Sequence, residues 1–180
     1  MNQHTITLVL FGQFSKRLLD TVSDAVSHEF LCVVNRREAR VDLSTFFDSG
    51  RRQYNGDMIL NEISSMKITG PVKVIGLVSV DLFIPILTYI FGQAQLGGKT
   101  AVASLYRLSN ESYGMPENKE ILYQRFAKEI IHELGHTFGL IHCHNLNCVM
   151  QSSTYVEDID QKEARFCDEC RKLISILPAF

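Results

Sequence analysis

The run HELGHTFGLIH, from His132 to His142, constrains this 180-residue chain more than any other feature. His132 and His136 are four residues apart, so on a helix both imidazoles project from one face. That spacing suits a single Zn²⁺ ion with Zn–N bonds of about 2.0–2.1 Å. Glu133 follows the first histidine and is placed beside the metal, where it can take a proton from zinc-bound water.

Gly139 and His142 extend this pattern beyond the helix. The glycine lets the chain leave the helix sharply, with a positive φ angle, and the turn returns His142 as a third nitrogen ligand. Three protein ligands leave a fourth position open, which is the arrangement of a catalytic zinc. HExxH alone arises by chance in roughly one of a hundred such chains, and the added glycine and histidine lower this to the order of 10⁻⁵. Core histidines, the alternative, would not also require the glutamate and the glycine.

Four of the five cysteines lie in the last 40 residues, as the pairs Cys143 and Cys148 (C-x4-C) and Cys167 and Cys170 (C-x2-C). Two close pairs of thiolates suit a closed, tetrahedral structural zinc site with Zn–S bonds of about 2.3 Å. Plain buried thiols are one alternative. A redox C-x-x-C is another, but it would require a thioredoxin-like setting and leave the first pair unexplained. Cys32 lies in an apolar run and is interpreted as a core residue.

The two predicted sites are adjacent in the sequence, because Cys143 directly follows His142. One structural zinc would therefore fix the segment that carries the third histidine, together with the C-terminal helix. Small domains use metal ions in this way to order segments that lack a hydrophobic core of their own. We therefore predict two Zn²⁺ ions per chain, one catalytic and one structural.

The first 80 residues alternate between β-type apolar runs and apolar residues at helical spacing. They predict strands at Thr5–Phe11, Phe30–Val34 and Pro71–Val80, and helices at Ser15–His28 and Asn55–Ile63. This order predicts an α/β lobe with a mostly parallel twisted sheet. Further along, Thr88–Ala94 and Thr100–Leu108 flank a Gly-Gly turn, which predicts a hairpin with at least one antiparallel strand. A long helix over Lys119–Phe138 then carries the histidines, and a short helix near Cys167–Ile176 follows.

Composition excludes several classes of protein. The chain is 46% apolar and 21% charged with a net charge of −2, so disorder is not its main state. It is a poor match to a nucleic-acid binder, since the late cysteines have no basic cluster around them. The only basic residues there are Lys162, Arg165, Arg171 and Lys172. We expect no nucleic-acid partner.

The longest apolar stretch, Leu82–Phe91, is too short for a membrane helix, and the N-terminus has no signal-peptide pattern. We therefore expect no membrane partner, a cytoplasmic location and a monomer. One metallopeptidase domain over residues 1–180 is predicted. It divides into an N-terminal lobe at 1–139, with the sheet and the histidine helix, and a C-terminal lobe at 140–180.

HExxHxxGxxH followed by a methionine is the metzincin signature, which is matched here by the histidine run and by Met150. The cysteines resemble one branch, the archaemetzincins, whose pattern continues from the third histidine into C-x4-C-x-M and ends in C-x-x-C. The segments VDLFIPILTYIFGQAQLGG and AVASLYRL are also similar to that family. The resemblance thus covers roughly Arg51 to Cys170.

This resemblance implies a metzincin-like α/β (α+β) fold, with a twisted mixed sheet, an active-site helix and a small zinc-braced C-terminal lobe. It implies that Met150 forms a turn beneath the metal and has a packing role. It also implies that an edge strand binds extended substrate by strand addition. That strand is assigned to Gly97, Gly98, Thr100, Ala101, Val102 and Ala103. Ser152 occupies the position at which some metzincins have a tyrosine, so we assign no tyrosine ligand, and Tyr155 is interpreted as a surface or packing residue.

The resulting hypothesis is a zinc metallopeptidase with Glu133 as the general base and peptides or proteins as substrates. An apolar pocket below the helix would accept the side chain that follows the scissile bond. Two other readings stay open. One is a zinc-containing binding module with weak or no turnover, which the presence of Glu133 disfavours. The other is a non-peptidase amidohydrolase, which the same zinc chemistry would serve.

Overall fold

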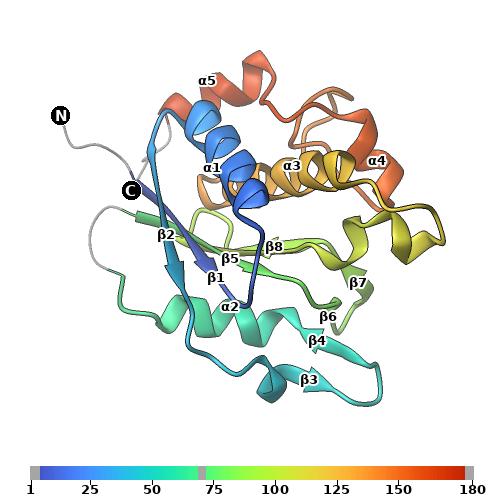
Figure 1. Cartoon of the computed structure of the whole chain (residues 1–180). Helices are drawn as coiled ribbons and strands as arrows, with labels where there is room; N and C mark the ends of the chain where they lie inside the picture. Colours follow the sequence, from blue (N-terminus) through green and yellow to red (C-terminus); the bar gives the residue numbers. More distant parts are fainter. Residues whose placement is uncertain (1–4, 69–71, 177–180) are drawn as a thin grey trace.

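A five-stranded sheet forms the centre of the computed structural model, which describes residues 5–68 and 72–176 (Figure 1). Its strand order is β2-β1-β5-β9-β8. The strands are β1 (Thr5–Leu10), β2 (Val33–Glu38), β5 (Val72–Val78), β8 (Gly92–Ala94) and β9 (Thr100–Ser104). Neighbouring strands are parallel except for β8, which runs antiparallel to β9. The predicted mostly parallel sheet with an antiparallel hairpin is confirmed.

Helices cover both faces of this sheet. The helices α1 (Lys16–Phe30) and α3 (Lys119–Thr137) lie on one face, and α2 (Gly56–Ser65) lies on the other (Figure 1). Strand β1 shows why, because its side chains alternate between the two faces. Ile6 and Leu8 belong to the core beneath α1 and α3, whereas Val9 belongs to the core beneath α2.

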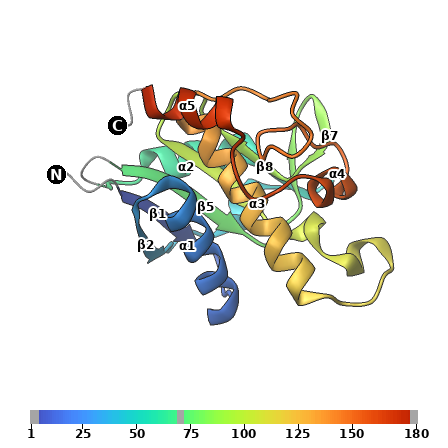
Figure 2. The same ribbon diagram turned by 90° about the horizontal axis from the view of Figure 1, so that it is seen from above.

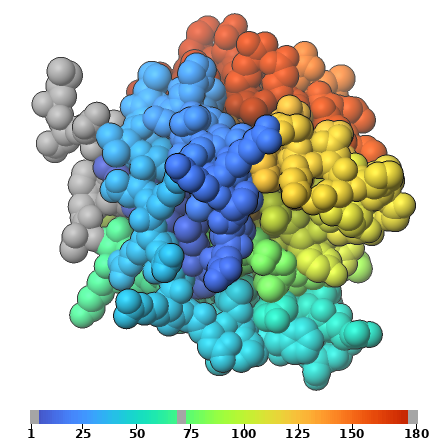
Figure 3. Space-filling view, viewed as in Figure 1, coloured from blue at the N-terminus to red at the C-terminus, as the bar shows by residue number. Residues whose placement is uncertain are grey.

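The helix α3 lies between two other parts of the chain. In Figure 2, α1 lies on one side of α3 and α4 (Val156–Gln161) lies on the other. In the face shown in Figure 3, the surface of α1 (blue) adjoins the segment that begins α3 (yellow), where Arg17 and Glu120 form an ion pair. The side chain of Asn118 caps α3 by accepting a hydrogen bond from the backbone N–H of Ile121.

A second, four-stranded sheet was not predicted. Its order is β3-β4-β6-β7, and its strands are β3 (Phe47–Asp48), β4 (Gln53–Asn55), β6 (Leu82–Ile84) and β7 (Leu87–Ile90). The apolar run Leu82–Phe91 thus folds back on itself as the β6–β7 hairpin, with Pro85 and Ile86 between the strands. Strands of two to four residues are too short to give a periodic pattern.

The remaining elements are short, and the last of them was predicted. They are the 3₁₀ helices η1 (Leu43–Phe46), η2 (Tyr106–Leu108) and η3 (Asn110–Tyr113), the unpredicted α4, and α5 (Asp168–Ile176). Within the described ranges, no helix is long and apolar enough to span a bilayer.

The second predicted strand, Phe30–Val34, is misplaced. The helix α1 continues to Phe30, and β2 begins at Val33 and runs through the polar residues Asn35 to Glu38. Because β2 is an edge strand with mostly exposed side chains, it has no apolar pattern to reveal it. Pro71, the predicted start of the third strand, lies outside the described residues.

Candidate active site and metal centres

The helix α3 brings His132 and His136 together on one face, as the four-residue spacing predicts. Their Nε2 atoms are 3.1 Å apart. Gly139 has a φ angle of 92°, and the backbone N–H of Leu140 donates a hydrogen bond of 3.1 Å to the carbonyl of Gly135. This turn returns His142 to the site, with its ring centroid 5.3 Å from that of His132 and 5.0 Å from that of His136.

The histidine orientations fit a bound cation. Nδ1 of His132 lies 2.7 Å from the carbonyl oxygen of Val149, and Nδ1 of His136 lies 2.7 Å from that of Leu140. A carbonyl oxygen only accepts, so both Nδ1 atoms carry the proton and both Nε2 atoms are bare acceptors. Two acceptors that face each other at 3.1 Å repel unless a cation lies between them. Tetrahedral zinc with Zn–N bonds of about 2.0–2.1 Å places its nitrogens about 3.3 Å apart.

Burial favours the neutral form of all three imidazoles, which is the form that metal ligation requires. It lowers the pKa of His132 well below its ordinary value, and it also lowers the pKa values of His136 and His142. The positive charge of Lys162 acts in the same direction on each of them. The ligand atoms of the three histidines all lie within 4.8 Å of one another. The residues therefore fit the zinc ion that the sequence predicts.

Glu133 lies beside these ligands and is 5% exposed. Burial raises the pKa of its carboxyl group well above the ordinary value, and the nearby Glu129 raises it further. Lys162 acts in the opposite direction. Gly92 of β8 packs directly against Glu133, since a Cβ atom on this glycine would lie 2.6 Å from Cγ and 2.9 Å from Oε1 of the glutamate. The base is thus held between α3 and β8.

The structure adds two charged residues that sequence analysis missed, Glu129 and Lys162. Both are buried, and Glu129 lines the same cleft as the histidines. Glu129 could have been found, because it stands four residues before Glu133 and therefore on the same helix face. Lys162 follows α4 and carries no sequence signal that connects it to the site.

Met150 is fully buried beneath the histidine helix, in agreement with the packing role that the resemblance implies. A Cβ atom on Gly135 would overlap the Met150 sulfur. The glycine within HELGH therefore allows the methionine to approach the helix backbone closely.

A cleft of about 780 Å³ contains the three histidines and Glu133. Residues 87–94 form one wall and residues 152–155 form the other. The hydroxyl of Tyr89 donates a hydrogen bond to the carbonyl of Thr154 at 2.8 Å, which joins the two walls. Apolar residues line much of this cleft, and Glu129, Ser152 and Ser153 line it as well, so the apolar pocket below the helix stays a prediction.

The predicted substrate strand is wrong in position. Thr100, Ala101, Val102 and Ala103 lie in β9, which is buried between β5 and β8 and has no free edge. Gly97 and Gly98 form the turn before it, where the Gly97 N–H donates to the carbonyl of His136 at 2.9 Å. The edge strand is β8 instead, because the hairpin returns β9 to the sheet interior.

The register of β8 shows which of its groups are free. Phe91 accepts from Ser104, Gln93 pairs with Val102, and Gln95 donates to Thr100. Antiparallel strands bond through alternate residues, so the main-chain groups of Gly92 and Ala94 point away from β9. Both residues line the cleft.

The four late cysteines also meet, with their sulfur atoms within 4.8 Å of one another. Cys143 Sγ lies 3.8 Å from Cys167 Sγ, which matches the S···S separation of about 3.8 Å in tetrahedral zinc with Zn–S bonds of about 2.3 Å. Two backbone N–H groups donate to sulfur, from Cys167 to Cys148 at 3.3 Å and from Asn145 to Cys143 at 3.4 Å. All four are free thiols, and Cys32 is a buried core residue as predicted.

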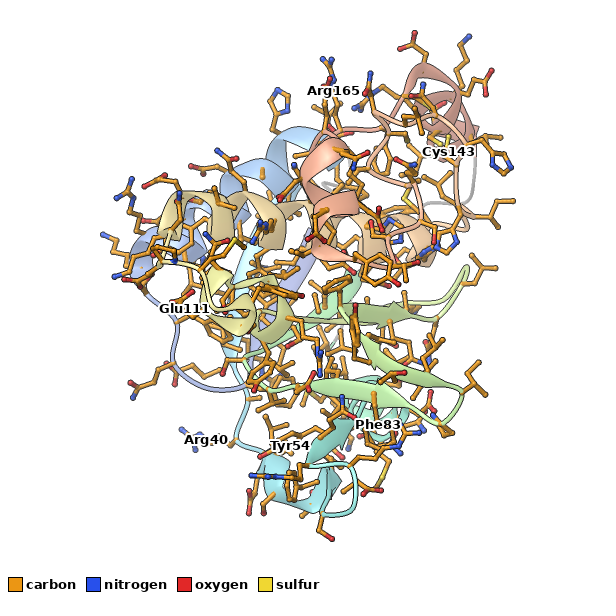
Figure 4. The ribbon with its side chains drawn as sticks, turned by 90° about the vertical axis from the view of Figure 1, so that its right-hand side faces the viewer. Arg40, Tyr54, Phe83, Glu111, Cys143 and Arg165 are labelled. Carbon is orange, nitrogen blue, oxygen red and sulfur yellow. The ribbon has the colours of Figure 1, made fainter. Side chains whose placement is uncertain are left out.

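The cysteine cluster is joined to the histidine site by the backbone. The N–H of Cys143 donates to the carbonyl of Met150 at 2.9 Å, and that of Val149 donates to Arg165 at 2.9 Å. The carbonyl of Val149 is the partner of His132. Figure 4 shows Cys143 and Arg165 in the C-terminal region, at the opposite end of the view from Tyr54 in the second sheet.

A three-histidine group that fits zinc, with a glutamate beside it in a cleft under a sheet edge, defines the class of zinc metallopeptidases. Comparison with known proteins agrees. The model of Peptidase family M54 matches residues 14–175. The chain belongs to this family, that of the archaemetzincins, and is accordingly a zinc metallopeptidase that acts on peptides.

Individual relatives are similar over most of their length. Archaemetzincin of Methanocaldococcus jannaschii is 40% identical over 134 residues, which is 74% of this chain and 73% of the relative. The crystal structure of archaemetzincin from Methanopyrus kandleri has a TM-score of 0.85 at 33% identity and covers 96% of this chain and 94% of its own. The crystal structure of archaemetzincin from Archaeoglobus fulgidus, complexed with malonate, has a TM-score of 0.77 at 31% identity. The match covers 94% of this chain and 99% of that structure's chain.

Proposed function

We propose that the chain hydrolyses peptide bonds at a zinc ion held by His132, His136 and His142, with Glu133 as the general base. The observation that supports this most directly is the convergence of bare Nε2 atoms next to a buried carboxyl in an open cleft. We also propose a second, structural zinc at Cys143, Cys148, Cys167 and Cys170, on the basis of the sulfur spacing. None of the five cysteines forms a disulfide, which is in keeping with the cytoplasmic location that we propose.

Zinc bound at the histidines would polarise the scissile carbonyl and lower the pKa of a water molecule towards about 7. The chain itself handles the proton. Glu133 accepts it from the attacking water and returns it to the leaving amine nitrogen. Burial raises the pKa of Glu133 and so makes its carboxylate a stronger base than an exposed glutamate. Gly92 permits the close approach of this carboxyl to the cleft wall.

We assign substrate binding to β8. The free N–H and C=O groups of Gly92 and Ala94 can pair with an extended peptide, which would add a strand to the sheet. Exposed apolar side chains line the same cleft from other segments, namely Leu87, Leu96, Ile141 and Tyr155. They offer apolar surface to side chains on either side of the scissile bond.

One observation favours the alternative, a zinc-containing binding module with weak turnover. The hydrogen bond between Tyr89 and Thr154 joins the two cleft walls, so a long substrate has to break it or pass beside it.

The test is to incubate the zinc-loaded protein with a diverse peptide library and to identify products by mass spectrometry. The matched control is Glu133→Gln, which keeps the side-chain shape and removes the base. We expect cleavage by the native protein and a loss of about 10²–10⁴-fold in kcat for the variant at unchanged zinc content. Peptide binding without cleavage would favour the binding module, and equal cleavage by both proteins would exclude Glu133 as the base.

A further inference from the structure

Lys73 is a buried charged side chain that has no role in the steps above. It is 4% exposed and lies in β5, on the same face of the sheet as Ile75 and Leu77 of the core beneath α3. An ammonium group is seldom buried this completely without polar partners, because it loses its hydration. The partners of Lys73 therefore show which parts of the fold it holds.

Two main-chain carbonyls accept hydrogen bonds from Nζ of Lys73, each at 2.8 Å. One belongs to Thr137, the last residue of α3, and the other belongs to Gly98, in the turn between β8 and β9. The ammonium group also lies 4.8 Å from the ring centroid of Phe138, which follows the helix. A cation at this place binds a carbonyl that the helix itself leaves without a partner, and it complements the negative end of the helix dipole.

These contacts reach further than an ordinary helix cap. Asn118 caps the start of α3 from the position next to it, whereas Lys73 is 64 positions away from Thr137. A second link lies beside the ammonium group, because the N–H of Gly97 donates to the carbonyl of His136 at 2.9 Å. The end of the histidine helix and the turn after β8 are thus joined at two adjacent points.

The two joined segments carry opposite parts of the cleft. The helix carries His136, while β8 carries the free main-chain groups of Gly92 and Ala94, and Leu96 of the turn also lines the cleft. In the described part of the chain β8 has three residues and pairs with β9 alone, so its own pairing holds it weakly. A peptide bound along β8 meets the metal ligands correctly only if strand and helix keep their spacing. A displacement of about 1 Å can cost 10²-fold in rate.

We propose that Lys73 is a positioning residue, which fixes the spacing between the β8 edge and the histidine ligands on α3. It is assigned no contact with the metal or with the substrate. This inference rests on the proposed function, because it takes zinc to bind at the histidines and the peptide to bind along β8.

The test uses two zinc-binding probes that differ in their reach. Acetohydroxamate binds the metal alone, whereas acetyl-trialanine hydroxamate adds main-chain groups that can pair with β8. A linked second contact adds roughly 10²–10⁴-fold to affinity only if the spacing permits both contacts. Calorimetry on the zinc-loaded protein gives both dissociation constants. We expect the native protein to prefer the peptide probe, and Lys73→Met to lose about 10–100-fold of that preference at unchanged acetohydroxamate affinity.

Two other lysines provide matched controls. Lys99 is exposed in the same turn, and Lys128 joins α3 to α4 by donating to the carbonyl of Ile159 at 2.9 Å. Neither lines the cleft. Lys99→Met and Lys128→Met should both keep the native preference, although Lys128→Met should lower the melting temperature.

Two further substitutions at the same position complete the comparison. Lys73→Arg keeps a cation with several donors, so it should retain most of the native preference for the peptide probe. If Lys73→Met does not fold, Lys73→Gln replaces it. This side chain keeps one polar group but is one atom shorter, so it should also lose the preference.

A second readout needs neither metal nor turnover. It is the hydrogen exchange of the Gly97 amide, whose N–H donates to the carbonyl of His136. Without the adjacent link this hydrogen bond should open more often, so we expect about 10-fold faster exchange in Lys73→Met and native exchange in Lys128→Met.

The outcomes separate the two proposals. If the native protein binds both probes equally, or neither, the proposed function fails in its substrate or metal assignment and the inference falls with it. If the native protein prefers the peptide probe, and Lys73→Met keeps that preference with native exchange at Gly97, only the role of Lys73 is overturned. If Lys73→Met and Lys128→Met lose the preference equally, general destabilisation is responsible and the inference is likewise overturned.

Discussion

The three-histidine site and the four-cysteine site are built on different physical principles. All three histidines come from one helix and the turn that follows it, within eleven residues. The helix α3 packs on the sheet, with Ile130 and Ile131 fully buried, so the core places two ligands before any metal binds. The cysteines instead come from two segments about twenty residues apart, on either side of α4.

The two sites also differ in the solvent exposure of their ligand side chains. The histidine ligands range from the buried His132 to the exposed His142 at the mouth of a cleft, whereas each cysteine pair has one buried and one half-buried thiol. The first site is therefore a preformed, open site. The second would depend on the metal that we propose there to fix two chain segments, although Cys148 and Cys170 also belong to the hydrophobic core. The comparison teaches that the packing of one helix places the open ligand set, whereas the closed set joins two segments that are distant in the sequence.

The strongest test of this contrast is stepwise removal of metal. We expect a mild chelator to remove the histidine-bound zinc first, with little change in the fold, because that site is open. Removal of the cysteine-bound zinc should unfold the C-terminal lobe, since such sites contribute about 10–16 kcal/mol in zinc-finger peptides. Zinc content and near-UV circular dichroism are followed against chelator concentration. Loss of both ions in one step, together with the fold, would contradict the contrast.

The next effect concerns communication between the sites. Cys167→Ser should weaken zinc binding at the histidines by about 10–100-fold, although Cys167 touches none of them. The path runs from the cysteine cluster through the hydrogen bond between Cys143 and Met150, and through Val149, whose carbonyl orients His132. Zinc affinity is measured by competition with a chelator of known affinity.

Cys32→Ser is the matched control, because Cys32 is a buried cysteine of the main core and belongs to neither of the described groups that could hold a metal. It should lower the melting temperature and leave zinc affinity unchanged. Equal losses of zinc affinity in both variants would show that general destabilisation, and not the connection between the sites, is responsible.

A smaller effect should follow from the packing of Met150. Alanine normally stabilises a helix relative to glycine, by roughly 0.5–1 kcal/mol. Gly135→Ala should nevertheless destabilise this protein by about 1–3 kcal/mol, because the new methyl group would overlap the Met150 sulfur. Urea unfolding measures the change. In the double variant with Met150→Ala the two losses should not add, and simple additivity would show that the two residues do not interact.

Residues close in sequence could be predicted, and residues brought together only by the fold could not. The spacing of His132 and His136 follows from the period of a helix, and the C-x-x-C pair is local in the same way. The prediction of the substrate-binding strand was wrong because a hairpin pattern does not reveal which of its two strands pairs with β5. Both strands of the hairpin are short, and only the folded sheet shows that β9 pairs with β5 and leaves β8 at the edge.

Glu129 and Lys162 illustrate the same limit. Each looks like an ordinary surface residue in the sequence, and only the packing of α3 against the segment after α4 buries both of them. The second sheet was missed because its strands of two to four residues carry no periodic signal.

The smallest predicted effect concerns the cleft that distinguishes the open site from the closed one. Tyr89→Phe removes the hydroxyl that donates to the carbonyl of Thr154, while the ring remains against Phe91 and Arg107. A single hydrogen bond contributes about 0.5–1.5 kcal/mol, so stability should fall only slightly. The two cleft walls should then separate more often. We expect faster amide hydrogen exchange at residues 152–155, and a lower KM for long peptides at unchanged kcat.

Tyr113→Phe provides the control for that experiment. The hydroxyl of Tyr113 also donates to a carbonyl at 2.8 Å, that of Arg107, but Tyr113 does not line the cleft. The two substitutions therefore remove the same chemical contact in different places. If both variants change hydrogen exchange at 152–155 and KM equally, the Tyr89 contact does not govern access. If only Tyr89→Phe does, the hydrogen bond between Tyr89 and Thr154 governs the access of long peptides to the histidine site.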